Sequence, residues 1–305
     1  MVQANRVKLL AIVGCTAVGK SETALKLAER FNGELIGADS MQIYKGFDIG
    51  TGKLTKDECG GVVHKMIDIV DGDADFSVGE YVELAKKEIQ KTIDCGKTPI
   101  VVGGTGLYVY SLLSGCNFAD TPKDEMYRRA LKLTAHFFGQ SVMHELLNNV
   151  DGASAQKISA NDGKRVIRAL EIYHLCGKPR SAAVVRDKPY DDLTIVLTLP
   201  RPLLYDRINA RVKKMFDDGL IRETKELLKY KECGSMQALG YKQIASDPTA
   251  PREYLEAITA QKTRNYAKRQ TTYFNNMKLN KVFIDARNYE QVVDVARSFW
   301  GICNE

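Results

Sequence analysis

The sequence predicts an α/β fold in which a parallel sheet is flanked by helices and interrupted by a helical insertion domain. Three observations predict it. Short apolar runs typical of buried strands alternate with amphipathic helical segments in the first hundred residues. A Gly-rich turn follows the first apolar run. From about residue 120 to residue 187 the pattern is helical, and strands resume after residue 190. We therefore expect a core of residues 1–118 and 190–305 and an insertion domain of residues 119–189.

Five apolar segments are expected to form the strands of the sheet. They are Lys8–Val13, Glu34–Ala38, Thr98–Val102, Leu193–Leu199 and Val282–Asp285. The spacing of apolar residues predicts core helices at Glu22–Phe31, Phe76–Ile93, Leu203–Lys231, Glu253–Asn276 and Tyr289–Trp300. Ser77 is the expected N-cap of the second of these helices. Strands that alternate with helices imply right-handed β-α-β units and hence parallel strands.

The Gly-rich turn matches the phosphate-binding pattern G-x-x-x-x-G-K-[ST]. It comprises Gly14, Cys15, Thr16, Ala17, Val18, Gly19, Lys20 and Ser21, between a predicted strand and a predicted helix. Its glycines let backbone N–H groups point inward, beside the positive end of the helix dipole. Lys20 supplies a charge for phosphate oxygens, and Ser21 can bind a Mg²⁺ ion that bridges them. These features predict a P-loop NTPase-like parallel sheet that binds a phosphate-bearing small molecule, without specifying which.

Composition is that of a globular protein in a reducing compartment. Of the 305 residues, 44% are hydrophobic and 27% are charged. No apolar run approaches the length of a membrane span, and the N-terminal segment lacks the features of a signal peptide. The seven Cys show no C-x-x-C spacing, which argues against a zinc or redox site. We expect a cytoplasmic monomer that does not associate with membranes.

Two further loops follow predicted strands. Asp39 lies at the end of the second strand, where ligands bind in open α/β sheets, and its carboxylate could take a proton. The alternative is an N-cap or turn Asp. The polar, Gly-rich residues 40–53 come next and suit a binding loop. Gly103 and Gly104 follow the third strand, and Thr105 adds a hydroxyl. A purely structural turn is the alternative there.

Seven sequence blocks occur in the order typical of bacterial tRNA dimethylallyltransferases, which the chain resembles from about residue 8 to residue 285. They are GCTAVGKS, DSMQIYKGFDIGTGK, PIVVGGTGLY, NDGKRVIRALEIY, LYDRINARV, ALGYKQ and YAKRQTTYF. Three departures from the family pattern stand out. Cys15 and Val18 replace a Pro and a small polar residue, Tyr273 replaces a Trp, and Lys65 follows His64 where the family has a second His.

The resemblance implies a specific reaction. Members of this family transfer a dimethylallyl group from dimethylallyl diphosphate to N6 of the adenosine immediately 3′ of the anticodon in tRNA, and they release diphosphate. Such a reaction would use the P-loop and Mg²⁺ to hold the leaving group. It also implies that Asp39 is the general base and that Thr105 orients the adenine or the diphosphate. Arg207 and Arg211, four residues apart on one helix face, are expected to bind diphosphate oxygens.

The same resemblance, with local excesses of positive charge, predicts the residues that contact the tRNA anticodon stem-loop. Residues 119–189 carry 12 Lys/Arg against 8 Asp/Glu, and residues 252–281 carry 7 against 2. In the core the expected contacts are Asp39, Ser40, Met41, Gln42, Thr105, Gly240, Tyr241 and Lys242, with Lys262, Arg264, Lys268 and Arg269 on the last long helix. In the insertion they are Lys123, Tyr127, Lys164, Arg165, Val166, Ile167 and Arg168.

Three other functions remain open at this point. A small-molecule kinase would also use a P-loop, Asp39 and a helical lid. An isopentenyltransferase that acts on free adenine nucleotides would not need two basic surfaces. An RNA-binding protein with a vestigial P-loop is opposed by the intact Lys20, Ser21 and Asp39.

Overall fold

The structure is a computed structural model that describes residues 6–115, 124–179, 181–182 and 188–302. The chain divides into two compact units. The first comprises Met1–Ser114 and Lys188–Glu305, and the second is Gly115–Asp187, compared with the insertion at 119–189 expected from the sequence. Each unit is described by itself.

The first unit is built on a six-stranded sheet in the order β3-β2-β4-β1-β5-β6. Every neighbouring pair of strands is parallel, which confirms the predicted α/β class. The strands are β1 Lys8–Gly14, β2 Gly33–Gly37, β3 His64–Lys65, β4 Thr98–Gly103, β5 Asp191–Thr198 and β6 Lys281–Asp285. Sequence patterns missed β3, because a strand of two half-buried residues has no recognisable period.

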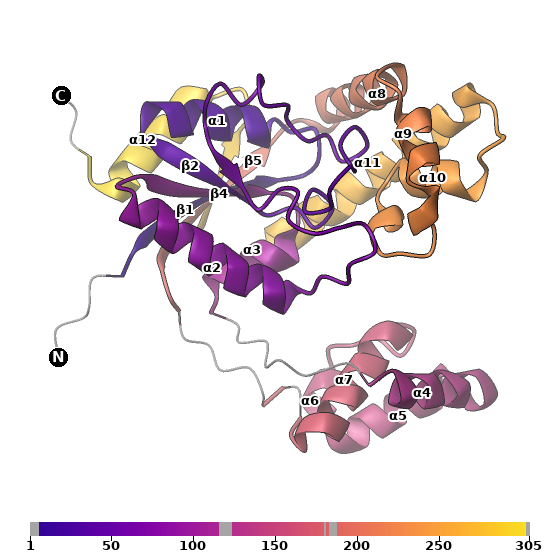
Figure 1. Ribbon diagram of the computed structural model, residues 1–305. Helices are drawn as coiled ribbons and strands as arrows, with labels where there is room; N and C mark the ends of the chain where they lie inside the picture. The colour runs from indigo at the N-terminus through magenta and orange to yellow at the C-terminus, as the bar shows by residue number, and fades with distance from the viewer. Residues whose placement is uncertain (1–5, 116–123, 180, 183–187, 303–305) are drawn as a thin grey trace, which may run out of the picture. The chain divides into compact units, whose positions relative to one another are not determined.

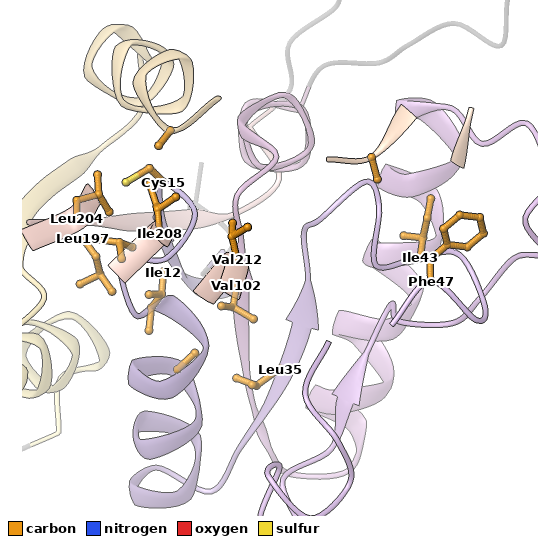
Figure 2. Close-up of a cluster of buried hydrophobic side chains, with 14 of the residues drawn as sticks. Ile12, Cys15, Leu35, Ile43, Phe47, Val102, Leu197, Leu204, Ile208 and Val212 are labelled. Carbon is orange, nitrogen blue, oxygen red and sulfur yellow. The ribbon is translucent and has the colours of Figure 1, made fainter. Parts of the chain in front are cut away.

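Helices cover both faces of this sheet (Figure 1). On one face lie α1 Lys20–Arg30 and α12 Tyr289–Trp300, and on the other lie α2 Val78–Asp94 and α3 Gly106–Leu113 (Figure 1). Side chains of β1 alternate between the two hydrophobic layers: Leu10 and Ile12 enter one, and Leu9 and Ala11 enter the other. Because both faces of β1 are buried in these layers, its sequence is a continuous apolar run. Figure 2 shows Ile12 in the first layer with Leu197 and Ile208.

The predicted helix at Leu203–Lys231 is wrong as a single element. The structure has α8 Arg201–Asp217, α9 Leu220–Glu226 and a 3₁₀ turn at Leu228–Tyr230. Gly219 has φ of 104°, a left-handed conformation that ends α8 and turns the chain before α9. Two other elements are close to their predicted bounds: α11 spans Arg252–Asn276, and Ser77 caps α2 with a capping box.

In the described residues of the second unit, four helices form a small bundle. They are α4 Glu125–Phe138, α5 Gln140–Val150, α6 Gly152–Ala155 and α7 Gly163–Cys176. Its core packs Met143 and Leu147 of α5 against Val166 and Ala169 of α7. Throughout the described part of both units, no helix is both long and apolar enough to cross a membrane.

Candidate active site

The P-loop segment joins the central strand to a helix. β1 ends at Gly14 and α1 begins at Lys20, so the free N–H groups of the first turn of α1 face the carboxyl edge of the sheet. Gly14 has φ of 152°, and a Cβ there would lie 2.7 Å from the carbonyl oxygen of Leu197. Gly19 has φ of 109° and caps the helix in a left-handed conformation. The motif therefore forms the turn that the sequence predicts.

Lys20 lies at the centre of the site. Its Nζ donates a hydrogen bond of 2.8 Å to the carbonyl oxygen of Cys15. Burial lowers its pKa to about 8, the nearby Arg211 adding to the effect while Asp39 opposes it. An anion beside Lys20 would restore the ordinary pKa, so the free site is electrostatically prepared for a phosphate.

A cavity of about 370 Å³ opens at the carboxyl edge of the strands. Its walls come from all three predicted loops and from helices α8 and α11. The residues singled out in the sequence that line it include Thr16, Ala17, Lys20, Ser21, Asp39, Ser40, Met41, Gln42, Gly103, Gly104, Arg211 and Arg269. Cys15 and Val18 lie beneath, in the hydrophobic core. The placement agrees with the rule that ligands bind at this edge of open α/β sheets.

Asp39 lies two residues after the end of β2, and its own loop holds it. Its Oδ1 accepts a hydrogen bond of 3.0 Å from the N–H of Met41. A Cβ on Gly104 would lie 3.7 Å from Lys20 Nζ and 3.8 Å from Asp39 Oδ2, so the ammonium and the carboxylate both approach this glycine. The closest approach to this glycine is that of Gln270, whose Nε2 would lie 2.6 Å from the same Cβ.

Thr105 supports the Asp39 loop from the neighbouring strand. Its Oγ1 accepts a hydrogen bond of 2.9 Å from the N–H of Ser40 and donates one of 3.2 Å to Ser40 Oγ. Its own N–H donates to the carbonyl oxygen of Ala38 at 3.0 Å. In this structure Thr105 therefore orients Ser40, and the orientation of substrate by its hydroxyl stays a prediction.

Arg207 and Arg211 of α8 both reach the P-loop region. Arg211 Nη2 donates to the carbonyl oxygen of Thr51 at 3.3 Å, and its side chain lines the cavity. Burial lowers the pKa of Arg211, while Asp39 opposes the shift. Arg207 is more exposed, and its Nη1 donates to the carbonyl oxygen of Val18 at 3.3 Å. The sequence left open which arginine binds an anion, and the cavity favours Arg211.

Sequence reasoning assigned no role to two polar residues of the site. Gln270 of α11 accepts a hydrogen bond of 2.8 Å from the N–H of Thr16 and donates one of 2.9 Å to the carbonyl oxygen of Gly104. It thus ties the P-loop to the third loop. His64 of β3 lines the cavity, and among the described residues neither ring nitrogen has a hydrogen-bond partner. Burial lowers the pKa of His64 to about 4, so the ring is neutral. Gln270 stood inside the block YAKRQTTYF, and His64 stood beside one of the departures from the family pattern; these were the signals that could have found them.

The structure corrects two of the predicted tRNA contacts. Val166 is completely buried in the core of the second unit, so its side chain cannot reach a polyanion. Tyr241 is also completely buried, and its hydroxyl is engaged by Glu223 and by the N–H of Gly50. Apolar spacing would have placed Val166 correctly, but its position inside a basic block concealed it.

The remaining predicted tRNA contacts occupy varied environments. On α7, Lys164 and Arg165 are exposed, Ile167 packs partly against the core, and Arg168 pairs with the buried Glu171. Tyr127 stacks on His174, with ring centroids 4.0 Å apart. Lys123 lies outside the described residues.

Among the predicted tRNA contacts of the first unit, some side chains are simply exposed and others already contact a neighbouring residue. On α11, Lys262 and Lys268 are exposed, while Arg264 donates to Asn209 at 2.7 Å and Arg269 lies over the Tyr266 ring. Lys242 is exposed, and its side chain donates a hydrogen bond of 2.8 Å to Gln237. Gly240 is the N-cap of α10, Tyr241–Ser246.

The residues at the cavity suit a magnesium ion bound through a phosphate. Ser21 and Asp39, whose side chains carry oxygen ligands, both line the cavity together with Lys20. Among the residues that the structure describes, no group of three His, Cys, Asp or Glu is arranged to hold a metal by itself. Mg²⁺ does not need such a cage, because it commonly takes one or two protein oxygens, substrate phosphates and water.

The fold and the cavity define a class: an α/β protein with a P-loop-type turn, a facing carboxylate and two cationic side chains. The chain matches the family model for IPP transferase over residues 42–277. It is 42% identical to a tRNA dimethylallyltransferase of Bacillus cytotoxicus, an alignment that covers 99% of this chain and 97% of the relative.

Solved structures agree. A tRNA isopentenylpyrophosphate transferase of Bacillus halodurans has 40% identity and a TM-score of 0.72, and the match covers 96% of this chain and 97% of that one. A eukaryotic dimethylallyltransferase acting on tRNA has 28% identity and a TM-score of 0.83, over 97% of this chain and 80% of that one. The chain therefore belongs to the IPP transferase family, which confirms the resemblance seen in the sequence.

Proposed function

We propose that the protein transfers the dimethylallyl group of dimethylallyl diphosphate to N6 of the adenosine immediately 3′ of the anticodon in tRNA. The observation that carries this proposal is the convergence of Lys20, Arg211 and Asp39 on one cavity. Cations beside the P-loop suit a diphosphate leaving group, and the carboxylate suits the proton released by an amine nucleophile. The names of the relatives support the same reaction.

The chemistry follows from the roles of these groups. The bond between the allylic carbon and the diphosphate oxygen breaks, and its electron pair leaves with the diphosphate. The N6 lone pair forms the new carbon–nitrogen bond, and Asp39 takes the N6 proton. Lys20 and Arg211 stabilise the negative charge that grows on the departing oxygens, because both already lie in a partly desolvated cavity.

A magnesium ion fits the proposal. Ser21 would hold it on the P-loop side, and its charge would help to neutralise the diphosphate. The protein residues do the rest: the α1 N-terminus and Lys20 bind the diphosphate, and Arg211 fixes its other face.

The nucleic-acid substrate must deliver a single base to the cavity. An adenosine stacked within an anticodon loop has to be extruded, which suits the recognition of bases on their edges. Gln42 lines the cavity beside Met41; its NH₂ group donates to the carbonyl oxygen of Thr51, and its amide oxygen can accept a hydrogen bond from such an edge. The exposed Lys262 and Lys268 on α11, with Lys164 and Arg165 on α7, would bind phosphates.

A transfer assay tests the proposal. Purified protein is incubated with radiolabelled dimethylallyl diphosphate, Mg²⁺ and unmodified tRNA that carries adenosine beside the anticodon. Parallel reactions contain AMP in place of tRNA, or ATP in place of the prenyl donor. We expect label in tRNA alone. Label in AMP alone would indicate a nucleotide isopentenyltransferase, and phosphate transfer from ATP without prenylation would indicate a kinase.

A further inference from the structure

A carboxylate outside the cavity holds one of its walls in place. Residues 48–52, here called the Gly50 loop, run past helix α9, where Glu223 lies. The N–H of Ile49 lies 3.0 Å from each carboxylate oxygen of Glu223, and the N–H of Gly50 donates to Oε1 at 3.4 Å. One acidic side chain therefore accepts hydrogen bonds from two successive backbone N–H groups.

Tyr241 completes this clamp from the neighbouring helix α10. Its hydroxyl accepts a hydrogen bond of 3.0 Å from the N–H of Gly50 and donates a short one to Glu223. Burial and the Glu223 carboxylate raise the pKa of Tyr241 well above its usual value, so the hydroxyl keeps the proton that it donates. The ring also packs edge-on against Phe47, with centroids 5.1 Å apart.

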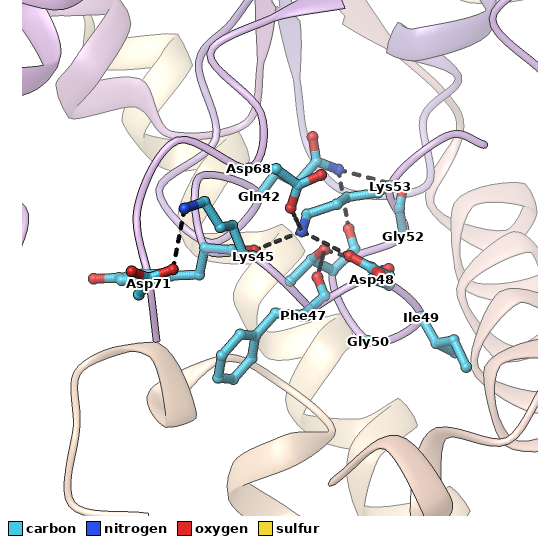
Figure 3. A network of polar contacts seen from close by, with 12 residues as sticks. Gln42, Lys45, Phe47, Asp48, Ile49, Gly50, Gly52, Lys53, Asp68 and Asp71 are labelled. Atoms are coloured by element: carbon cyan, nitrogen blue, oxygen red, sulfur yellow. Dashed lines mark hydrogen bonds and ion pairs between the residues drawn. The ribbon is translucent and has the colours of Figure 1, made fainter. Parts of the chain in front are cut away.

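The backbone of Gly50 lies directly against the clamp. A Cβ on Gly50 would lie 2.3 Å from the Tyr241 ring. On the other side of the loop, Lys53 is nearly buried and donates to the carbonyl oxygen of Tyr44 at 2.6 Å and to Asp48 at 2.7 Å (Figure 3). The Gly50 loop is thus fixed on both flanks.

The far end of the Gly50 loop touches two residues of the cavity. The carbonyl oxygen of Thr51 accepts hydrogen bonds from Arg211 Nη2 at 3.3 Å and from Gln42 Nε2 at 3.1 Å. Gly52 lies directly against the guanidinium, since a Cβ there would be 1.9 Å from Arg211 Nη2. Figure 3 shows Gln42 reaching toward this end of the loop. Thr51 and Gly52 therefore both contact the guanidinium of Arg211.

We propose that Glu223 and Tyr241 are positioning residues for the diphosphate site, acting through the Gly50 loop on Arg211. The inference rests on the proposed function, which makes Arg211 a diphosphate ligand. A carboxylate suits this task because it only accepts hydrogen bonds, and it faces only donors here. A glutamine at the same place would turn an NH₂ group toward a donor.

The test is the binding of inorganic pyrophosphate to the full chain, measured by calorimetry in the presence of Mg²⁺. We expect Glu223→Gln to weaken binding by about 10-fold to 100-fold, the range typical of residues that orient a ligand-binding group. Tyr241→Phe keeps the packing but loses the hydroxyl, so a smaller loss is expected. Glu226→Gln is the matched control, because Glu226 lies on the same helix and is largely exposed.

A double-mutant cycle separates positioning from a loss of folding. If Glu223 acts through Arg211, Glu223→Gln should cost less than about twofold once Arg211→Ala is present, since neighbouring groups in one network are not additive. Additive losses in the cycle would overturn the inference alone. So would pyrophosphate affinities of Glu223→Gln and Tyr241→Phe that both equal that of Glu226→Gln, provided that the wild type still prenylates tRNA. Failure of the wild type to bind pyrophosphate would overturn the proposed function and this inference together.

Discussion

At the scale of single residues, Asp39 is the side chain on which the proposed chemistry depends most. It faces Lys20 across Gly104, and the loop that carries it is held by Thr105. We expect Asp39→Asn to lower kcat by about 10² to 10⁴, the usual contribution of a general base, with a smaller effect on tRNA affinity. Single-turnover prenylation and a separate tRNA-binding assay check this. Asp71→Asn, at an exposed carboxylate, is the control. An unchanged kcat would remove Asp39 from the role.

Lys20 gives the same site a pH dependence. Its pKa of about 8 in the free protein means that the ammonium loses its proton as the pH rises through 8. A bound diphosphate favours the charged form, so binding takes up a proton above this pH. Pyrophosphate affinity should then fall by up to about tenfold per pH unit above 8. Lys20→Arg keeps its charge and should show a flatter profile. Identical slopes in titrations from pH 6 to 10 would contradict the assignment.

At the scale of secondary-structure elements, α11 matters because one of its side chains connects two loops. Gln270 pairs with the N–H of Thr16 and with the carbonyl oxygen of Gly104, and it is almost completely buried. Gln270→Ala leaves both partners unsatisfied, which costs about 1–3 kcal/mol of unfolding free energy for each group. Urea denaturation measures the loss. Gln261→Ala, at an exposed position on the same helix, should change stability little. Equal stability of the two variants would show that water replaces Gln270.

Elements of the fold differ in how far sequence alone could predict them. Strand β1 and the P-loop are encoded locally, by an apolar run and by glycines at fixed spacing, and both form where expected. The end of α8 was missed because amphipathic spacing continues across Gly219, and only the left-handed backbone there interrupts the helix. Gln270 could not be assigned because its partner Thr16 is 254 positions away, and no local pattern encodes such a contact.

At the scale of the whole molecule, the two basic surfaces lie in different units of the chain. Lys164 is exposed on α7 of the second unit, and Lys262 is exposed on α11 of the first. If both bind tRNA phosphates, each lysine releases a counterion on binding. Lys164→Ala and Lys262→Ala should each weaken tRNA binding at low salt and reduce the slope of log affinity against log salt by about 1.

The two substitutions should also act independently, because they lie in different units and share no partner. In the double variant, the slope of log affinity against log salt is then expected to fall by about 2, while kcat at saturating tRNA changes little. Lys157→Ala in the second unit and Lys86→Ala on α2 are the controls, since neither belongs to a predicted contact. A slope that falls only with Lys262→Ala would confine tRNA binding to the first unit and leave the exposed charge of α7 as a solvated helix face.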